Sequence, residues 1–170
     1  MNNKRLIEYD IAYMEMAIAI SKLSYAERNK VGCIIVSTES QVISQGYNGT
    51  PTGMDNCCEI TEHVHEINEN GILHDCSKLV TKKEVLHAES NAITKCAKNG
   101  YGSTNNGTIY VTLSPCFDCS KLVIQSGIKR VVYKEIYRNT DGLDLLTKAG
   151  IICEQLDIEK KKLIKYESNK

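Results

Sequence analysis

The segment TIYVTLSPCFDCSKLVIQSGIKRVVY, residues 108–133, contains an apolar β-rich run, a helix-like stretch that opens with Pro-Cys, and a second apolar run. It predicts a strand over 108–113, a helix over 115–126 that ends at Gly127, and a strand over 129–133. Alternation of strand and helix favours a parallel or mixed sheet with helices packed on its faces. In such sheets, functional sites form at the carboxyl ends of the strands.

The remainder of the chain continues this pattern on both sides. Apolar spacing predicts strands and helices in the order α-β-β-α-β-α-β-α-β, with five strands in all. The additional elements are expected to be a helix over about 8–24, a strand hairpin over 31–36 and 42–46, helices over 87–99 and 141–149, and a last strand over 151–156.

Two segments do not follow the pattern. Residues 54–86 are polar and acidic with weak periodicity, and they predict an insertion formed by a loop, with or without a short helix. Residues 158–170 form a Lys-rich tail that is expected to be solvated. No linker or internal repeat divides the chain, so residues 1–170 are expected to form one domain.

His87-Ala88-Glu89 and Pro115-Cys116-Phe117-Asp118-Cys119 carry the chemistry that we expect. One His and two Cys can supply three ligands to zinc and leave a fourth position open for water, as in catalytic zinc sites. Water bound to zinc ionises near neutral pH. Glu89, next to this open position, is suited to carry protons.

The two motifs are also expected to lie at helix N-termini. Pro115 fits the first position of a helix, which would place Cys116 and Cys119 on one helical face where the helix dipole favours thiolate. His87 opens the preceding helix in the same way. The alternatives are a closed structural zinc site, a redox Cys pair, or buried cysteines with no metal.

Composition narrows the classes of function. The 170 residues carry 21 basic and 21 acidic side chains, and this zero net charge argues against a polynucleotide partner. No apolar run is long enough to span a membrane and no secretory signal is present, so a reducing cytoplasm is expected. Of the eight cysteines, Cys33, Cys96 and Cys153 lie in apolar patterns and are expected to be core residues.

The order of elements and the two motifs together resemble the cytidine deaminase superfamily, and within it the deoxycytidylate (dCMP) deaminases of phages and bacteria. The resemblance implies a three-layer α/β/α fold with a mixed five-stranded sheet. It is carried by Val31-Gly32-Cys33-Ile34-Ile35-Val36, Gly46-Tyr47-Asn48-Gly49-Thr50-Pro51, His87-Ala88-Glu89-Ser90-Asn91-Ala92-Ile93, Tyr110-Val111-Thr112-Leu113-Ser114-Pro115-Cys116 and Gln125-Ser126-Gly127-Ile128-Lys129.

The resemblance implies hydrolysis of dCMP to dUMP and ammonia, which supplies dUMP for thymidylate synthesis. His87, Cys116 and Cys119 would hold Zn2+, and Glu89 would move protons to ring N3 and to the leaving ammonia. The backbone of Ala88 and Ser114 would flank the base. Contacts to sugar and phosphate are expected from Asn48, Arg28 and Tyr137, although Arg28 and Tyr137 could equally be an ordinary loop charge and an ordinary tyrosine.

The resemblance also implies regulation and assembly. Activation by dCTP with Mg2+, inhibition by dTTP, and a hexamer are expected. The loop that matches the nucleotide-sensing region contains Gly46, Tyr47, Asn48 and Gly49.

Residues 54–86 hold three of the four histidines, and a second, structural zinc would account for this density. The candidate ligands are Cys57, Cys58, His63, His65, His74 and Cys76. The alternative is a polar loop with incidental His and Cys.

Two other functions stay open. One is another deaminase of the superfamily, acting on a free nucleoside, an RNA base or a pterin-type metabolite. The other is a non-catalytic zinc-binding or nucleotide-sensing module, against which the presence of Glu89 argues.

Overall fold

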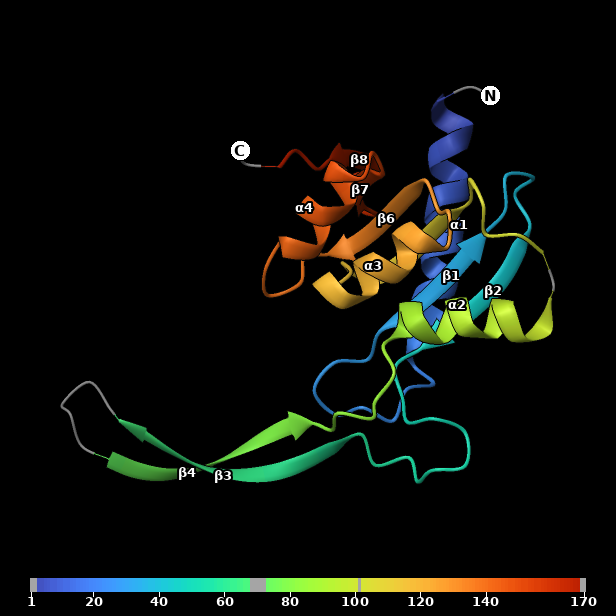
Figure 1. Cartoon of the computed structure of the whole chain (residues 1–170). Helices are drawn as coiled ribbons and strands as arrows, with labels where there is room; N and C mark the ends of the chain where they lie inside the picture. The colour runs from blue at the N-terminus through green and yellow to red at the C-terminus, as the bar shows by residue number, and fades with distance from the viewer. Residues whose placement is uncertain (1–2, 68–72, 101, 169–170) are drawn as a thin grey trace.

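The computed structural model describes residues 3–67, 73–100 and 102–168, and Figure 1 shows their arrangement. Helices and strands alternate through most of this range. In chain order the elements are α1 (Asn3–Ser21), β1 (Gly32–Val36), β2 (Val42–Tyr47), β3 (Glu59–Ile67), β4 (Leu73–Thr81), α2 (Ala88–Asn99), β5 (Thr108–Leu113), α3 (Phe117–Gln125), β6 (Arg130–Glu135), α4 (Asp141–Lys148), β7 (Ile152–Asp157) and β8 (Lys162–Lys165).

The main sheet is mixed and has the strand order β2-β1-β5-β6-β7-β8. Strands β5, β6 and β7 are parallel and are joined through α3 and α4, whereas β2, β1 and β8 are antiparallel to their neighbours. The α/β class and the mixed sheet predicted from the sequence are confirmed. The prediction of five strands is wrong, because the Lys-rich segment after β7 turns back and forms β8 as a sixth strand.

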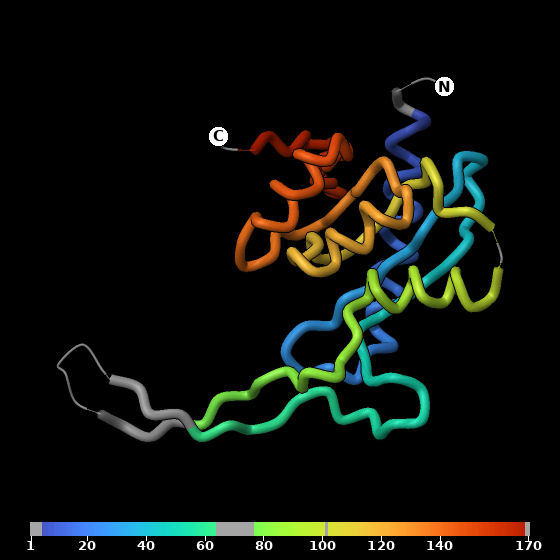
Figure 2. The backbone as a smooth tube through the Cα atoms, in the orientation of Figure 1, coloured from blue at the N-terminus to red at the C-terminus, as the bar shows by residue number. Residues whose placement is uncertain are grey.

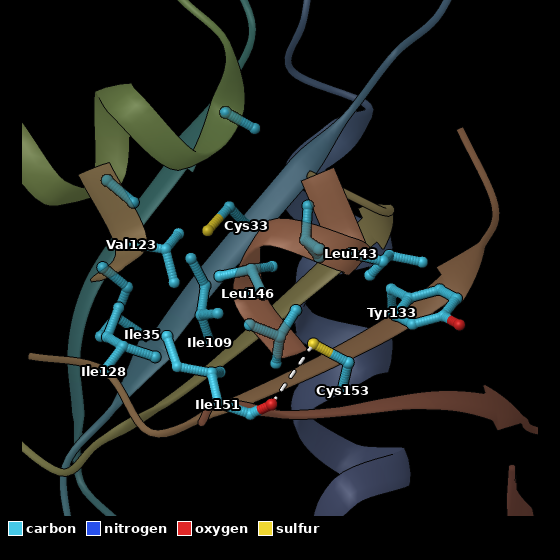
Figure 3. Packing of buried hydrophobic residues seen from close by; sticks show 14 residues of the cluster. Cys33, Ile35, Ile109, Val123, Ile128, Tyr133, Leu143, Leu146, Ile151 and Cys153 are labelled. Atoms are coloured by element: carbon cyan, nitrogen blue, oxygen red, sulfur yellow. Dashed lines mark hydrogen bonds between the residues drawn. The ribbon is translucent and has the colours of Figure 1, made fainter. Parts of the chain in front are cut away.

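Helices cover both faces of this sheet. Successive residues of a strand point to opposite faces, and β1 follows this rule: Cys33 and Ile35 pack in one core cluster, while Ile34 and Val36 pack in the other. The first cluster lies under α2, α3 and α4, and Figure 3 shows its apolar side chains interlocked around Leu146. The second cluster lies under α1. All four β1 side chains are buried, so the three-layer arrangement follows from a strand that is apolar on both faces.

A buried charge network ties α1 to the sheet. Asp10 of α1 has no solvent exposure, and its carboxylate accepts hydrogen bonds from Arg130 Nη1 at 2.6 Å and Nη2 at 2.8 Å. The Tyr110 hydroxyl donates to the same carboxylate at 2.7 Å, and Arg130 Nε donates to Glu154 at 2.7 Å. Each polar group therefore has a partner inside an otherwise apolar layer.

The segment 54–86 differs from the prediction of a loop with or without a short helix. It forms a hairpin in which β3 and β4 pair from Glu59↔Thr81 to Ile67↔Leu73. Figures 1 and 2 show this hairpin extending away from the main sheet. Four consecutive residues of β3, Ile60 to His63, are all exposed, so both faces of this part of the ribbon meet water. The sequence there lacks the alternation of apolar and polar residues that marks a half-buried strand.

Other boundaries shift by a few residues. The first helix spans Asn3–Ser21 rather than 8–24, and Ser21 Oγ donates to the Ile18 carbonyl in its last turn. Cys33, Cys96 and Cys153 are buried, as predicted. Within 3–67, 73–100 and 102–168, no helix has both the length and the apolar character needed to cross a membrane.

Candidate active site

Two helices begin at the edge of the sheet where β5 ends. His87 is the N-cap of α2 and Cys116 is the N-cap of α3, and both have extended backbone conformations. Neither side chain makes a capping hydrogen bond, so the imidazole and the thiol are available for another partner. Pro115 was expected to be the first residue of the helix, but it precedes the N-cap, and the helix begins two residues later, at Phe117.

The three predicted ligands meet at one point. His87 Nδ1 lies 3.4 Å from Cys116 Sγ and 3.5 Å from Cys119 Sγ, and the three donor atoms all lie within 4.8 Å of one another. Among the side chains that the structure describes, this is the one group of three His, Cys, Asp or Glu ligands so arranged. The N-termini of the two helices thus bring His87 close to two cysteines that lie 29 and 32 positions further along the sequence.

The ionisation of these groups suits a zinc ion. Interaction with the Cys119 thiol lowers the pKa of Cys116 to about 4, and the same interaction raises the pKa of Cys119. The hydrogen bond with Cys116 raises the pKa of His87. The neighbours of Cys116 therefore favour its thiolate form. A set of one imidazole and two sulfur ligands has the composition of a three-ligand catalytic zinc site, and such a site requires thiolates.

Glu89 lies in the first turn of α2 beside the cluster, and only 3% of its surface is exposed. Burial raises its pKa from 4.5 to about 7, since a carboxylate is costly to remove from water. A carboxyl group with a pKa near neutrality can both accept and donate a proton at physiological pH. This property suits Glu89 to the proton-carrying role that the sequence predicts for it.

These groups open onto a cavity of about 410 Å³, a volume typical of small-molecule sites. Its lining includes buried Glu89 as well as exposed Arg28 and Arg138. The other lining residues are Asn29, Val31, Asn48, Glu59, Thr81, Val85, His87, Ala88, Leu113, Ser114, Cys116, Glu135, Ile136 and Tyr137.

Comparisons with known proteins agree with this geometry. The family model "Cytidine and deoxycytidylate deaminase zinc-binding region" matches residues 7–135. This chain belongs to that family. The deoxycytidylate deaminase of phage T4 is 37% identical to it, over 89% of this chain and 91% of the phage protein. The crystal structure of a cyanophage S-TIM5 dCMP deaminase with dCMP and dUMP superimposes with a TM-score of 0.74 at 39% identity, covering 88% and 97% of the two chains.

Yeast deoxycytidylate deaminase is also similar to this member of the deaminase family. It is 34% identical over 86% of this chain, and the match spans 44% of the yeast protein. The family likeness therefore extends to eukaryotic enzymes of greater length.

Asn48 has a structural task in addition to the sugar contact predicted for it. Its Oδ1 accepts from Val31 N–H at 2.8 Å, and its Nδ2 donates to the Asn29 carbonyl at 2.8 Å. Because both ends of the amide bind the backbone, Asn48 fixes the segment before β1 along the cavity wall. The predicted sugar contact stays a prediction.

The residues predicted at the base and phosphate ends all line the cavity. Ala88 and Ser114 are buried, and Ser114 Oγ accepts from Tyr137 N–H at 2.8 Å, which fixes the loop after β6. The Arg138 guanidinium lies 5.2 Å from the Tyr137 ring centroid. Sequence analysis missed Arg138, although its place just after a parallel strand next to β5 was a usable signal.

The loop predicted to sense nucleotides packs tightly against α2. A Cβ at Gly46 would lie 2.3 Å from the Ala88 carbonyl oxygen, so the backbone of β2 directly contacts the helix that bears Glu89. The Tyr47 carbonyl accepts from Asn91 Nδ2 at 2.8 Å, and Gly49 forms a bridge with Leu86. A nucleotide role for this loop stays a prediction.

Part of the predicted second metal site lies outside the residues that the structure describes. The side chains of His65, His74 and Cys76 lie outside the described residues. Of the others, Cys57 and His63 are exposed, whereas Cys58 is buried. The described side chains of this set do not form a three-ligand group.

Proposed function

We propose that this protein is a deoxycytidylate deaminase that hydrolyses dCMP to dUMP and ammonia. The observation that carries this proposal is a buried carboxyl group, Glu89, beside a three-donor cluster in a cavity that also bears two arginines. The family membership supports the chemistry, and the S-TIM5 complex with dCMP and dUMP supports the substrate.

In this proposal His87, Cys116 and Cys119 hold the zinc ion. Zinc, when bound, supplies Lewis acidity that activates water near neutral pH. Glu89 takes the two protons of the attacking water in turn at its carboxylate and delivers one to ring N3 of cytosine and the other to the departing ammonia, as the C4–O bond forms and the C4–N bond breaks. Its burial keeps the pKa near 7, between the requirements of a base and those of an acid. The cavity wall formed by Ala88 and Ser114 orients the base.

The phosphate end is assigned to Arg28 and Arg138. Both guanidinium groups line the cavity and are exposed, as a charge-assisted contact to a phosphate requires. Tyr137 lies between Ser114, which fixes its backbone, and Arg138, which stacks on its ring. This end accounts for a preference for the nucleotide over the free nucleoside.

The resemblance noted in the sequence extends the proposal further. It predicts supply of dUMP for thymidylate synthesis, activation by dCTP with Mg2+, inhibition by dTTP, and a hexamer. The density of His and Cys in the hairpin segment predicts a second, structural zinc. The cytoplasmic location predicted from the sequence also stays a prediction.

Substrate choice tests the function directly. We expect the absorbance change of cytosine deamination with dCMP, a much weaker change with deoxycytidine, and none with RNA. Reaction of the free nucleoside alone would overturn the substrate assignment, and inactivity toward every cytosine compound would overturn the enzyme assignment.

Metal content tests the ligand set. The variant Cys119→Ser should lose bound zinc and turnover together, because it removes one of three ligands. Asp118→Asn is the matched control, because Asp118 lies between the two cysteines, is 84% exposed and pairs with Lys121. Retention of zinc by Cys119→Ser, or its loss from Asp118→Asn, would refute the assignment.

A further inference from the structure

The base of the β3–β4 hairpin forms part of the cavity wall. Glu59, the first residue of β3, and Thr81, the last residue of β4, face each other in the strand register, and both line the cavity. The hairpin is therefore joined to the proposed active site at its base.

Glu59 is a buried carboxylate whose bonds go to a loop. Only 7% of its surface is exposed. One carboxylate oxygen accepts from Glu27 N–H at 3.1 Å and the other accepts from Arg28 N–H at 3.4 Å. A buried charge is tolerated where hydrogen bonds compensate its lost hydration, so the two successive amides hold the carboxylate and are held by it.

The same base also contacts the side chain of Arg28. Thr81 Oγ1 accepts from Arg28 Nη1 at 3.3 Å. A small apolar cluster of Ala26, Cys58 and Val85 also packs the loop against the hairpin base. Arg28 is thus fixed at its backbone by one strand and at its guanidinium by the other.

We propose that Glu59 is a positioning residue for the phosphate end of the substrate, acting through Arg28. The bonds of Glu59 hold the backbone of Arg28 and the bond to Thr81 holds its guanidinium, and together they keep Arg28 at the cavity wall. The inserted hairpin then serves substrate selection through its base. This inference rests on the proposed function and on the assignment of Arg28 to the phosphate.

Kinetics with two substrates separate positioning from general support of the fold. For Glu59→Ala we expect KM for dCMP to rise about tenfold with kcat changed less than about twofold, the size of one charge-assisted contact. KM for deoxycytidine, which has no phosphate, should change less than about twofold. Glu59→Gln keeps one acceptor and should fall between Glu59→Ala and the unmodified chain. Glu62→Gln, an exposed acid on the same strand, should change neither constant.

A double variant and a binding measurement complete the test. If Glu59 acts through Arg28, the double variant Glu59→Ala/Arg28→Gln should bind dCMP no more weakly than Arg28→Gln alone. Titration calorimetry with dUMP should show the same loss of affinity without turnover, and deoxyuridine should show none. Thermal unfolding and zinc content identify variants that fail to fold. Thr81→Val is then the milder test, because it removes the contact to the Arg28 guanidinium and should raise KM for dCMP but not for deoxycytidine.

The outcomes are distinct. Equal losses for dCMP and deoxycytidine, or additive effects in the double variant, would overturn the positioning role. An unchanged KM for dCMP in Arg28→Gln would also overturn it while leaving the deaminase function intact. Failure of the unmodified chain to deaminate dCMP would refute the proposed function, and the dUMP titration would still test Glu59.

Discussion

Replacing Glu89 by Gln should remove most of the catalytic turnover and should also remove a loss of stability that the metal-free protein undergoes as pH rises from 5 to 8. Burial raises the pKa of Glu89 from 4.5 to about 7. Between these two values the folded state binds more protons at this residue than the unfolded state, so stability falls as pH rises and levels off above about pH 8. Gln does not titrate, and the variant lacks this decline.

The magnitude follows from the two pKa values. Integration of the linkage relation between pH 5 and pH 8 gives about 2.5 kcal/mol lost by the unmodified chain at this one residue. The free energy of unfolding of Glu89→Gln, relative to the unmodified chain, should therefore rise by about 2.5 kcal/mol over this interval. Any fixed cost of placing an amide in the site cancels in this difference, because it does not vary with pH.

Urea unfolding of chelator-treated protein at pH 5 and pH 8 measures this difference. Chelation is needed because the binding of metal releases protons from its ligands and adds its own pH dependence. The exposed control Glu62→Gln should give stability differences from the unmodified chain that are equal at the two pH values. Equal differences for Glu89→Gln would refute the argument that burial sets the pKa of this carboxyl. With zinc restored, turnover of Glu89→Gln should fall by about 10² to 10⁴.

Two further substitutions test the scaffold. Asp10→Asn should cost about 3 kcal/mol in urea unfolding, because it removes the fully buried charge that binds both Nη atoms of Arg130 and leaves Glu154 as the remaining partner charge. Asp157→Asn, in the pair with the largely exposed Lys160, should cost much less. Gly46→Ala should cost about 1–3 kcal/mol of stability and reduce turnover, because the added Cβ would displace α2. The control Gly49→Ala should be nearly neutral in stability, because its added Cβ would lie 3.9 Å from the nearest atom. Equal costs for the two substitutions would contradict the close packing at Gly46.

The sequence predicts the fold best where burial is strongest. Strand β5 was expected over 108–113 and observed at those residues, because its apolar run is buried on both faces and bounded by Gly107 and Pro115. Strand β8 escaped prediction because Lys162 and Lys165 project into water at the edge of the sheet. An edge strand bearing lysines is a common means of blocking unwanted pairing, and its sequence is indistinguishable from a solvated tail.

The candidate site also has one part that the sequence predicts and one part that it does not. The metal cluster could be predicted because each half is a local motif at a helix start, so spacing along the chain carries the information. The bond between Glu59 and Arg28 could not be predicted, because it depends on how a hairpin of polar residues is oriented against a loop 31 residues away. Nothing local distinguishes Glu59 from the other acidic residues among the 21 in the chain.

The site also places residues that are unfavourable for stability at the positions that carry the proposed function. His87 and Cys116 occupy N-cap positions without making capping bonds, and each missing cap costs about 1 kcal/mol relative to Ser or Asp. Glu89 is held in a place where its charged form is disfavoured. These costs are concentrated around one cluster of donor atoms, and the binding of a metal there would offset them. The chain therefore places destabilising residues where the binding of a metal would offset their cost in stability. The network around Asp10, on the opposite face of the sheet, is fully paired.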